Sequence, residues 1–149
     1  MSKDGMAAFL ARPLIARLAT ADGEQPRVLP MWYRWDGANL WMETSATFPN
    51  YRILKRNPRA AVTIDQSLGG LRLRAVVMLG SIEIIDTPSS AVEDELRRIY
   101  ERYLTSEEMA SVGREMIRTG THVILRFVPG RITTWESVAD NQTAAGSNP

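Results

Sequence analysis

A run of hydroxyl side chains followed by basic ones lies near the middle of the chain. Thr44 and Ser45 end a predicted strand and open a short predicted helix, which carries Arg52, Lys55 and Arg56. The start of a helix presents unpaired N–H groups and the positive end of the helix dipole, so it suits an anion, above all a phosphate. The alternative is a helix cap with a solvated basic face.

Arginines of two other predicted strands could also bind an anion. Arg27 opens one strand, where it is either a ligand contact or a solvated strand end. Arg72 and Arg74 alternate along another strand and should share one of its faces. Because two arginines are costly to bury unpaired, we expect them to meet a phosphate or a carboxylate such as Glu83.

Residues for catalysis by side chains alone are scarce. His122 is the only histidine, so a multi-histidine metal site is excluded, and its place in a strand favours a structural role. The chain has no cysteine, which excludes disulfides and thiol chemistry. It has no nucleophile elbow, P-loop or GxGxxG motif. The sequence therefore assigns no catalytic residue, and an enzyme of this kind would need a cofactor for the difficult chemistry.

Length, charge and hydropathy narrow the classes of protein that fit. The chain has 149 residues, 44% of them hydrophobic, which is enough for one domain with a core. Its 18 basic and 17 acidic residues give a net charge of +1, which argues against a nucleic-acid or acidic-membrane binder. No apolar stretch approaches the roughly 20 residues of a membrane span, and the N-terminus is too short in its apolar part for a secretory signal. We therefore expect a cytoplasmic protein.

A hairpin at the centre of the chain must position the candidate residues. Residues 27–35 read as one strand with two largely apolar faces, which predicts a strand covered on both sides. Asp36-Gly37 is a hairpin signal, after which residues 40–43 return. A short helix follows over residues 44–56. It ends there because Pro58 pushes the residue before it out of the helical region.

The remaining elements are mostly strands joined by short turns. Strands are predicted over residues 14–20, 27–35, 40–43, 60–65, 71–85, 121–128 and 131–135. We expect the fifth of them to bend at Gly80 and a turn at Pro129-Gly130 to separate the last two. Helices are expected over residues 5–11, capped by Asp4, and between residues 90 and 119, with capping-box spacings at Ser90/Glu93 and Thr105/Glu108. Such a pattern favours an antiparallel sheet or barrel of six to seven strands with peripheral helices.

Two domain-level predictions complete this outline. Residues 1–136 form a single domain, and the small, polar residues 137–149 form a flexible tail. The chain has four tryptophans, for which core or dimer packing is the favoured role and ring stacking on a ligand is the alternative.

The order of these motifs resembles a known family. The sequence reads R-V-x-P-x-W-x-x-W-D-G, L-W-x-x-T-S, L-x-R-N-P-R, A-V-T-I-D, L-R-A-V-V-M-L-G-S-I-E-I-I and finally P-G-R-I-T-T-W-E. Over residues 9–136 it is similar to the split β-barrel flavin-binding superfamily, which includes pyridoxamine 5'-phosphate oxidase and relatives that use FMN or a deazaflavin coenzyme.

The resemblance implies a fold, an activity and a set of site residues. The fold is a mainly β split β-barrel of the FMN-binding type, assembled as a homodimer with FMN or coenzyme F420 at its interface. The activity is that of an oxidoreductase that transfers a hydride to or from a small conjugated substrate. Residues of the first hairpin strand line the cofactor ring, and the strand-to-helix junction grips its phosphate. The implied cofactor-binding residues are Arg27, Val28, Leu29, Pro30, Met31, Trp32, Thr44, Ser45, Asn50, Arg52, Arg72 and Arg74.

Asn50 departs from the family pattern. The family often has a lysine four residues before the leucine of the short helix, on what should be a solvated helix start. Here Arg52, Lys55 or Arg72 compensates for the missing charge, the cofactor is the deazaflavin coenzyme, or cofactor binding is lost. In the last case the protein is a non-catalytic flavin- or haem-binding module or a cofactor-free dimeric scaffold. Pyridoxamine phosphate oxidation itself is disfavoured, since no substrate-binding arginine segment follows Trp135.

Overall fold

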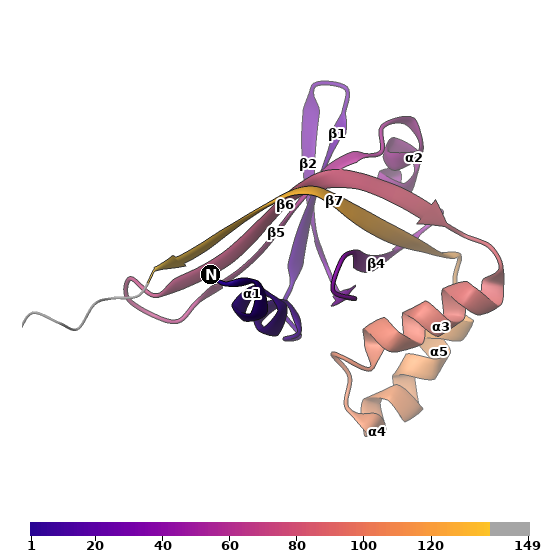
Figure 1. The fold of residues 1–149 in the computed structure, drawn as a ribbon. Helices are drawn as coiled ribbons and strands as arrows, with labels where there is room; N and C mark the ends of the chain where they lie inside the picture. The colour runs from indigo at the N-terminus through magenta and orange to yellow at the C-terminus, as the bar shows by residue number, and fades with distance from the viewer. Residues whose placement is uncertain (138–149) are drawn as a thin grey trace, which may run out of the picture.

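The computed structural model describes residues 1–137, in which seven strands form one antiparallel sheet (Figure 1). The strands are β1 Ala16–Asp22, β2 Gln25–Met31, β3 Tyr33–Trp35, β4 Leu40–Ser45, β5 Arg59–Ser67, β6 Leu73–Ile85 and β7 His122–Ser137. The helices are α1 Lys3–Leu10, α2 Pro49–Arg56, α3 Ser89–Tyr100, α4 Ser106–Glu108, the π-helical turn η1 Met109–Gly113 and α5 Arg114–Arg118.

The strand order explains how the sheet curls. Neighbouring strands follow the order β2-β1-β5-β6-β7-β4-β3. β2 and β3 are consecutive in the chain, yet they lie at opposite edges of this sheet. The chain between them therefore joins the two edges of a half-barrel, and the peripheral helices lie around it. This arrangement confirms the predicted mainly β split barrel.

The prediction of one covered strand over residues 27–35 is wrong. The chain leaves β2 at Met31, passes through Trp32 and begins β3 at Tyr33 on the other edge. β2 is an exposed edge strand, with Val28 60% exposed. The apolar pattern on both faces could not reveal the break, because both segments keep the alternation of a strand.

The long strands β6 and β7 bend together at Gly80. Gly80 pairs with Pro129 whereas Leu79 pairs with Arg131, so Gly130 is the extra residue of a β-bulge. The bend at Gly80 confirms the sequence prediction, but the predicted turn at Pro129-Gly130 is wrong, since β7 runs through both residues. The bulge absorbs the proline because an irregular position tolerates a missing N–H donor.

The helices begin and end largely where local chemistry predicts. Pro49 stands at the start of α2, and Asn57 before Pro58 ends it in an extended conformation. Thr105 and Glu108 form the predicted capping box of α4. The capping predictions at Ser90 and Asp4 are wrong: α3 begins after Pro88 without a side-chain cap, and Ser2 caps α1.

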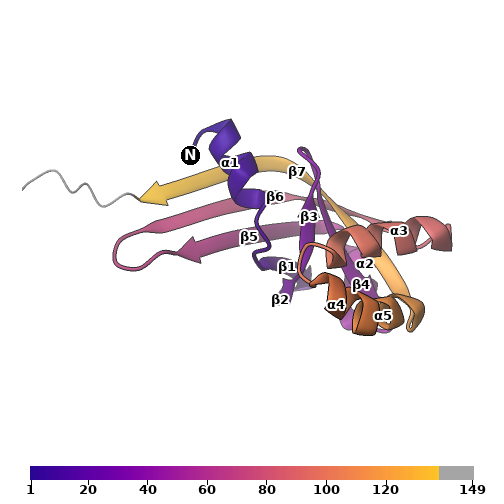
Figure 2. The ribbon, with the colours of Figure 1, turned by 90° about the horizontal axis from the view of Figure 1, so that it is seen from below.

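Two apolar clusters hold the fold together. The larger one fills the half-barrel, and its fully buried members include Tyr33, Met42 and Phe127. The smaller one packs α3 and α5 onto β7 through residues such as Leu96, Ile99 and Ile124. Burying each such side chain contributes roughly 1.5–3 kcal/mol. The helical unit, by which we mean residues 89–118, is thus bound to the sheet by its own core. It lies at the end opposite the extended tips of β5, β6 and β7 (Figure 2).

Two features of the sequence analysis concern the ends of the chain and its helices. The tail predicted over residues 137–149 lies, after Ser137, outside the described residues. No helix in the described part of the chain is long and apolar enough to cross a membrane.

A pair of glycine substitutions tests the bulge. A Cβ atom at Gly80 would lie 2.2 Å from the Val128 carbonyl oxygen, whereas at Gly130 its nearest neighbour is 3.6 Å away. We expect Gly80→Ala to lower the free energy of unfolding by about 1–3 kcal/mol, because backbone must move to admit the methyl group. Gly130→Ala is the control and should change it by less than about 0.5 kcal/mol. Urea unfolding measures both, and equal stability of the two variants would contradict this account.

Candidate functional site

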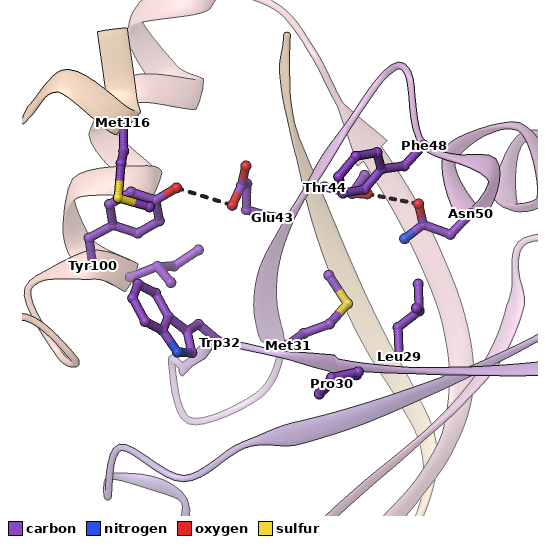
Figure 3. A pocket seen from close by; sticks show the side chains of 11 residues that line it. Leu29, Pro30, Met31, Trp32, Glu43, Thr44, Phe48, Asn50, Tyr100 and Met116 are labelled. Atoms are coloured by element: carbon purple, nitrogen blue, oxygen red, sulfur yellow. Dashed lines mark hydrogen bonds between the residues drawn. The ribbon is translucent and has the colours of Figure 1, made fainter. Parts of the chain in front are cut away.

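A pocket of about 380 Å³ lies between β2, β4 and the helices α3 and α5. This volume falls within the roughly 300–1,000 Å³ typical of small-molecule sites. Most of its walls are apolar, and a few polar groups face it from β4 and α2 (Figure 3). The lining residues are Leu29, Pro30, Met31, Trp32, Glu43, Thr44, Phe48, Asn50, Ile99, Tyr100 and Met116.

The change of sheet edge at Trp32 opens this pocket. Trp32 stacks on Tyr103 with ring centroids 4.8 Å apart and meets the Tyr100 ring edge-on at 5.5 Å. The Tyr103 hydroxyl accepts a hydrogen bond of 3.0 Å from the backbone N–H of Tyr33. These contacts attach the helical unit to Trp32 and Tyr33, the crossing segment where the chain passes between the two sheet edges.

Thr44 and Asn50 form a buried polar pair at one end of the pocket. The Thr44 hydroxyl donates to Asn50 Oδ1 at 2.8 Å, and both residues are 3% exposed. We expected Asn50 to lie on a solvated helix start, and that prediction is wrong because the residue is buried. Its Nδ2 is buried without a partner in the described residues, and Figure 3 shows this amide directed toward the space beside Thr44 and Leu29. Since an unpaired buried donor costs about 1–3 kcal/mol, a ligand atom that accepts from it would be stabilised there.

Tyr100, Glu43 and His122 form a chain of hydrogen bonds along the other side of the pocket. The Tyr100 hydroxyl donates to Glu43 Oε2 at 3.2 Å, and His122 Nδ1 lies 2.8 Å from Glu43 Oε1. The second ring nitrogen, His122 Nε2, lies 2.8 Å from the Met116 carbonyl oxygen. Glu43 thus receives contacts from α3 and from the first residue of β7.

The surroundings of these hydrogen-bonded side chains raise the pKa values of His122 and Tyr100. Burial by itself lowers the pKa of His122, but the hydrogen bond and charge of Glu43 outweigh it and raise that pKa above its ordinary value. Burial raises the pKa of Tyr100, and the neighbouring Glu43 carboxylate raises it further. At neutral pH Tyr100 is a neutral donor, while His122 is held toward its charged form.

The structure brings half of the twelve predicted cofactor contacts together. Six of them line the pocket: Leu29, Pro30, Met31, Trp32, Thr44 and Asn50. The other six lie outside it in this chain: Arg27, Val28, Ser45, Arg52, Arg72 and Arg74. Every arginine of the predicted set belongs to the second group, so the pocket has an apolar wall without a cation among residues 1–137.

The predicted residues outside the pocket have other surroundings. Arg27 approaches the Asp22 carboxylate at 3.9 Å, and Ser45 exchanges hydrogen bonds with the hydroxyls of Thr47 and Thr121. Val28 lies exposed on β2, and Arg52 lies on the exposed face of α2.

Arg72 and Arg74 do not alternate along one strand, and that prediction is wrong. Arg72 lies in the turn before β6, where only Arg74 belongs to the strand. Arg74 pairs with Glu136 at 2.8 Å. Glu83, the partner that we expected, pairs instead with Arg126 at 3.0 Å.

Sequence reasoning missed five lining residues. Ile99 and Tyr100 lie in the helical region predicted between residues 90 and 119, but nothing local indicated that they line a pocket. Met116 lies in an apolar helical pattern with Met109 and Ile117, whereas Phe48 carries no local signal. Glu43 gave no sign of a partner, because His122 lies 79 residues further along the chain.

The residues of the pocket fit a flat, partly apolar ring better than a metal ion. Among residues 1–137 no three metal-ligating side chains come together. The apolar wall suits a conjugated ring system, and the free Asn50 amide suits an acceptor atom at its polar end. The lining residues are therefore compatible with a flat conjugated ring that carries an acceptor atom at one end.

The sheet order and the curl of the sheet define a split-barrel protein. The family model described as pyridoxamine 5'-phosphate oxidase matches residues 2–136. The chain belongs to this family. No functionally curated sequence matches the chain.

Solved structures share the fold over almost the whole chain. The conserved hypothetical protein Rv2991 from Mycobacterium tuberculosis is 30% identical, with a TM-score of 0.76 over 91% of this chain and 85% of that one. A structure named F420 reductase is 26% identical, with a TM-score of 0.59 over 85% of this chain and 94% of that one. The FAD and heme binding protein from Mycobacterium smegmatis is 20% identical, with a TM-score of 0.70 over 98% of this chain and 78% of that one.

The Glu43–His122 pair makes stability depend on pH. Because the folded pKa of His122 is raised above its ordinary value of 6.5, the pair stabilises the fold fully below that value and less as the pH rises through the folded pKa. Glu43→Gln should therefore cost more stability at about pH 5.5 than at about pH 8.5, by urea unfolding. Glu83→Gln is the control, since its partner Arg126 does not titrate in this range and its cost should stay constant. A pH-independent cost of Glu43→Gln would contradict the ion pair.

Proposed function

We propose that the chain is an oxidoreductase that binds FMN or coenzyme F420 in this pocket and transfers a hydride to or from a small conjugated substrate. The observation that carries the proposal is an apolar pocket whose polar end holds a buried amide without a partner. Family membership and the likeness to a structure named F420 reductase support the same choice of cofactor class. A bound flavin or deazaflavin supplies the capacity to accept and donate a hydride.

The side chains of the pocket hold the ring and exclude water. Leu29, Pro30, Met31 and Trp32 form the wall from β2 and the crossing segment, and Phe48 lies at the side of α2. Their apolar surface keeps the reacting atoms dry, which strengthens each polar contact in the pocket. Placement and water exclusion are the main contributions of this wall.

The polar end of the cofactor lies toward the start of α2. Asn50 Nδ2 donates to an acceptor atom there, with Thr44 holding the amide in its orientation. Arg52 and Arg27 lie outside the pocket and are exposed, and they are the cations that we propose for the phosphate of FMN or F420. A charge-assisted hydrogen bond of this kind contributes about 1.5–3 kcal/mol.

An isosteric substitution tests the role of Asn50. Asn50→Asp keeps the oxygen that accepts from Thr44 but replaces the free donor by a carboxylate oxygen, which repels a phosphate. We expect it to weaken FMN and F420 binding at least tenfold in a fluorescence titration. Asn57→Asp makes the same chemical change at the far end of α2, where Oδ1 accepts from the Arg59 N–H, and should leave affinity unchanged. Equal affinities of the two variants would move the polar end of the cofactor elsewhere.

The absorption spectrum of the purified protein tests the proposed function itself. Flavin or deazaflavin bands, with the released cofactor identified by mass spectrometry, would support it. A Soret band would favour the alternative of a haem-binding module, a choice that the fold of the FAD and heme binding protein makes worth measuring. A colourless protein that binds neither FMN nor F420 in titration would leave only the cofactor-free scaffold.

We further propose that two copies of the chain form a homodimer over the exposed face of the half-barrel. β2 lies at an edge of the sheet, and large apolar side chains on the sheet lie open to solvent, among them Val28, Leu73, Leu79 and Trp135. Covering such an edge and patch removes an aggregation hazard. A partner chain would also close the open side of the pocket.

Light scattering tests the assembly. At micromolar concentration we expect a mass about twice the 16.7 kDa of one chain. Leu79→Glu and Trp135→Glu, which place charges on the exposed apolar face, should shift the mass toward that of one chain. A wild type that remains monomeric would contradict both the dimer and a shared cofactor site.

A further inference from the structure

Three titratable side chains connect the pocket with a second cavity. Tyr100 and Glu43 line the pocket, whereas His122 lines an outer cleft of about 230 Å³ beside α3 and α5. The His122 side chain is 15% exposed, so water in the cleft can exchange protons with it. The hydrogen bonds at 3.2 Å and 2.8 Å through Glu43 are therefore a continuous path between cleft and pocket.

The geometry around His122 favours the protonated form of its ring, so a proton is available at the start of this path. Each ring nitrogen of His122 lies 2.8 Å from an oxygen that can only accept, in the Glu43 carboxylate and the Met116 carbonyl. Only the doubly protonated ring donates to both. The other charged groups that face His122 across the cleft are Asp86, Glu93 and Arg118. Two acidic groups and one basic group give the cleft a net negative charge, which favours the charged imidazolium form of His122.

We propose that Tyr100, Glu43 and His122 form a proton-transfer chain from the outer cleft into the pocket, with Tyr100 as the catalytic acid. The inference rests on the proposed function. A conjugated substrate that accepts a hydride from a reduced flavin or deazaflavin must also gain one proton. The chain supplies that proton without admitting bulk water to the pocket.

The transfer conserves protons and charge. The Tyr100 O–H bond breaks as its proton binds the substrate atom that gains negative charge. The Glu43 carboxylate takes the Nδ1 proton of His122 and passes a proton to the phenolate oxygen, which returns Glu43 to its charged form. His122 is left neutral and recovers a proton from water in the cleft. The net change is one hydride from the reduced cofactor and one proton from water added to the substrate.

A purely structural role for these bonds makes a different prediction. In that case Tyr100 would only attach α3 to β4, as Tyr103 attaches the helical unit to the crossing segment. The Tyr103 hydroxyl donates to the Leu14 carbonyl at 2.7 Å and does not line the pocket. Tyr103→Phe therefore removes a comparable partly buried hydroxyl and is the matched control for Tyr100→Phe.

Because the protein has one histidine, the His122–Glu43 part of the proton-transfer chain can be tested without any cofactor. His122 gives the one imidazole signal in an NMR titration of the full chain, apart from any purification tag. We expect its midpoint to lie above the ordinary histidine range and to fall in Glu43→Gln. A midpoint that is the same in wild type and Glu43→Gln would overturn the proposal.

The second half is tested on the protein loaded with whichever of FMN or F420 it binds, reduced and mixed with the quinone-imine dye dichlorophenolindophenol. Reduction of this dye consumes one hydride and one proton. We expect Tyr100→Phe to slow it about a hundredfold, the usual size of a lost general acid. The solvent isotope effect of the wild type should disappear in that variant. Cofactor affinity should stay within about twofold of the wild type, because the phenol acts on the proton and not on cofactor binding.

The outcomes separate this inference from the proposed function. Dye reduction that is slowed in Tyr100→Phe but not in Tyr103→Phe supports the proton-transfer chain. Equal rates in Tyr100→Phe, Tyr103→Phe and wild type overturn it and leave the oxidoreductase intact. A wild type that binds neither cofactor, or that leaves the dye unreduced once loaded, overturns both.

Discussion

The passage of the chain from one sheet edge to the other at Trp32 is the constraint on which the rest of the structure depends. β2 and β3 are consecutive, yet no backbone ladder joins them, so the half-barrel is closed there by a covalent link alone. A gap without ladder hydrogen bonds must be lined by side chains, and here it is lined mostly by apolar ones. The position of the pocket therefore follows from the order of the strands and not from any one side chain.

The helical unit forms one wall of that gap. α3 and α5 bury their own core against β7, which brings Tyr100 and Met116 to the pocket. The same docking places His122, the first residue of β7, behind Glu43. Apolar packing thus carries the energy of docking, and the few polar contacts determine the chemistry. That division is economical because a buried ionic network alone contributes little net stability.

The parts of this molecule that follow from local chemistry could be predicted from the sequence. Pro58 ends α2, Gly80 bends β6, and the Thr105 capping box starts α4, since each depends on a few neighbouring residues. Contacts between distant segments could not be predicted. The Glu43–His122 pair spans 79 residues, and the break at Trp32 follows from pairing with two different strands. The ion pair of Arg74 could not be predicted for the same reason, because its partner Glu136 lies on β7.

The hydrogen bond from the Tyr33 amide to the Tyr103 hydroxyl has a dynamic consequence. This amide lies at the crossing segment, and its acceptor is a side chain of the helical unit. Whenever that unit swings away from the sheet, the amide loses its acceptor while the ladders of β1, β5 and β6 stay closed. Exchange of this one proton with heavy water therefore reports local opening of the helical unit and is insensitive to fraying at the barrel tips.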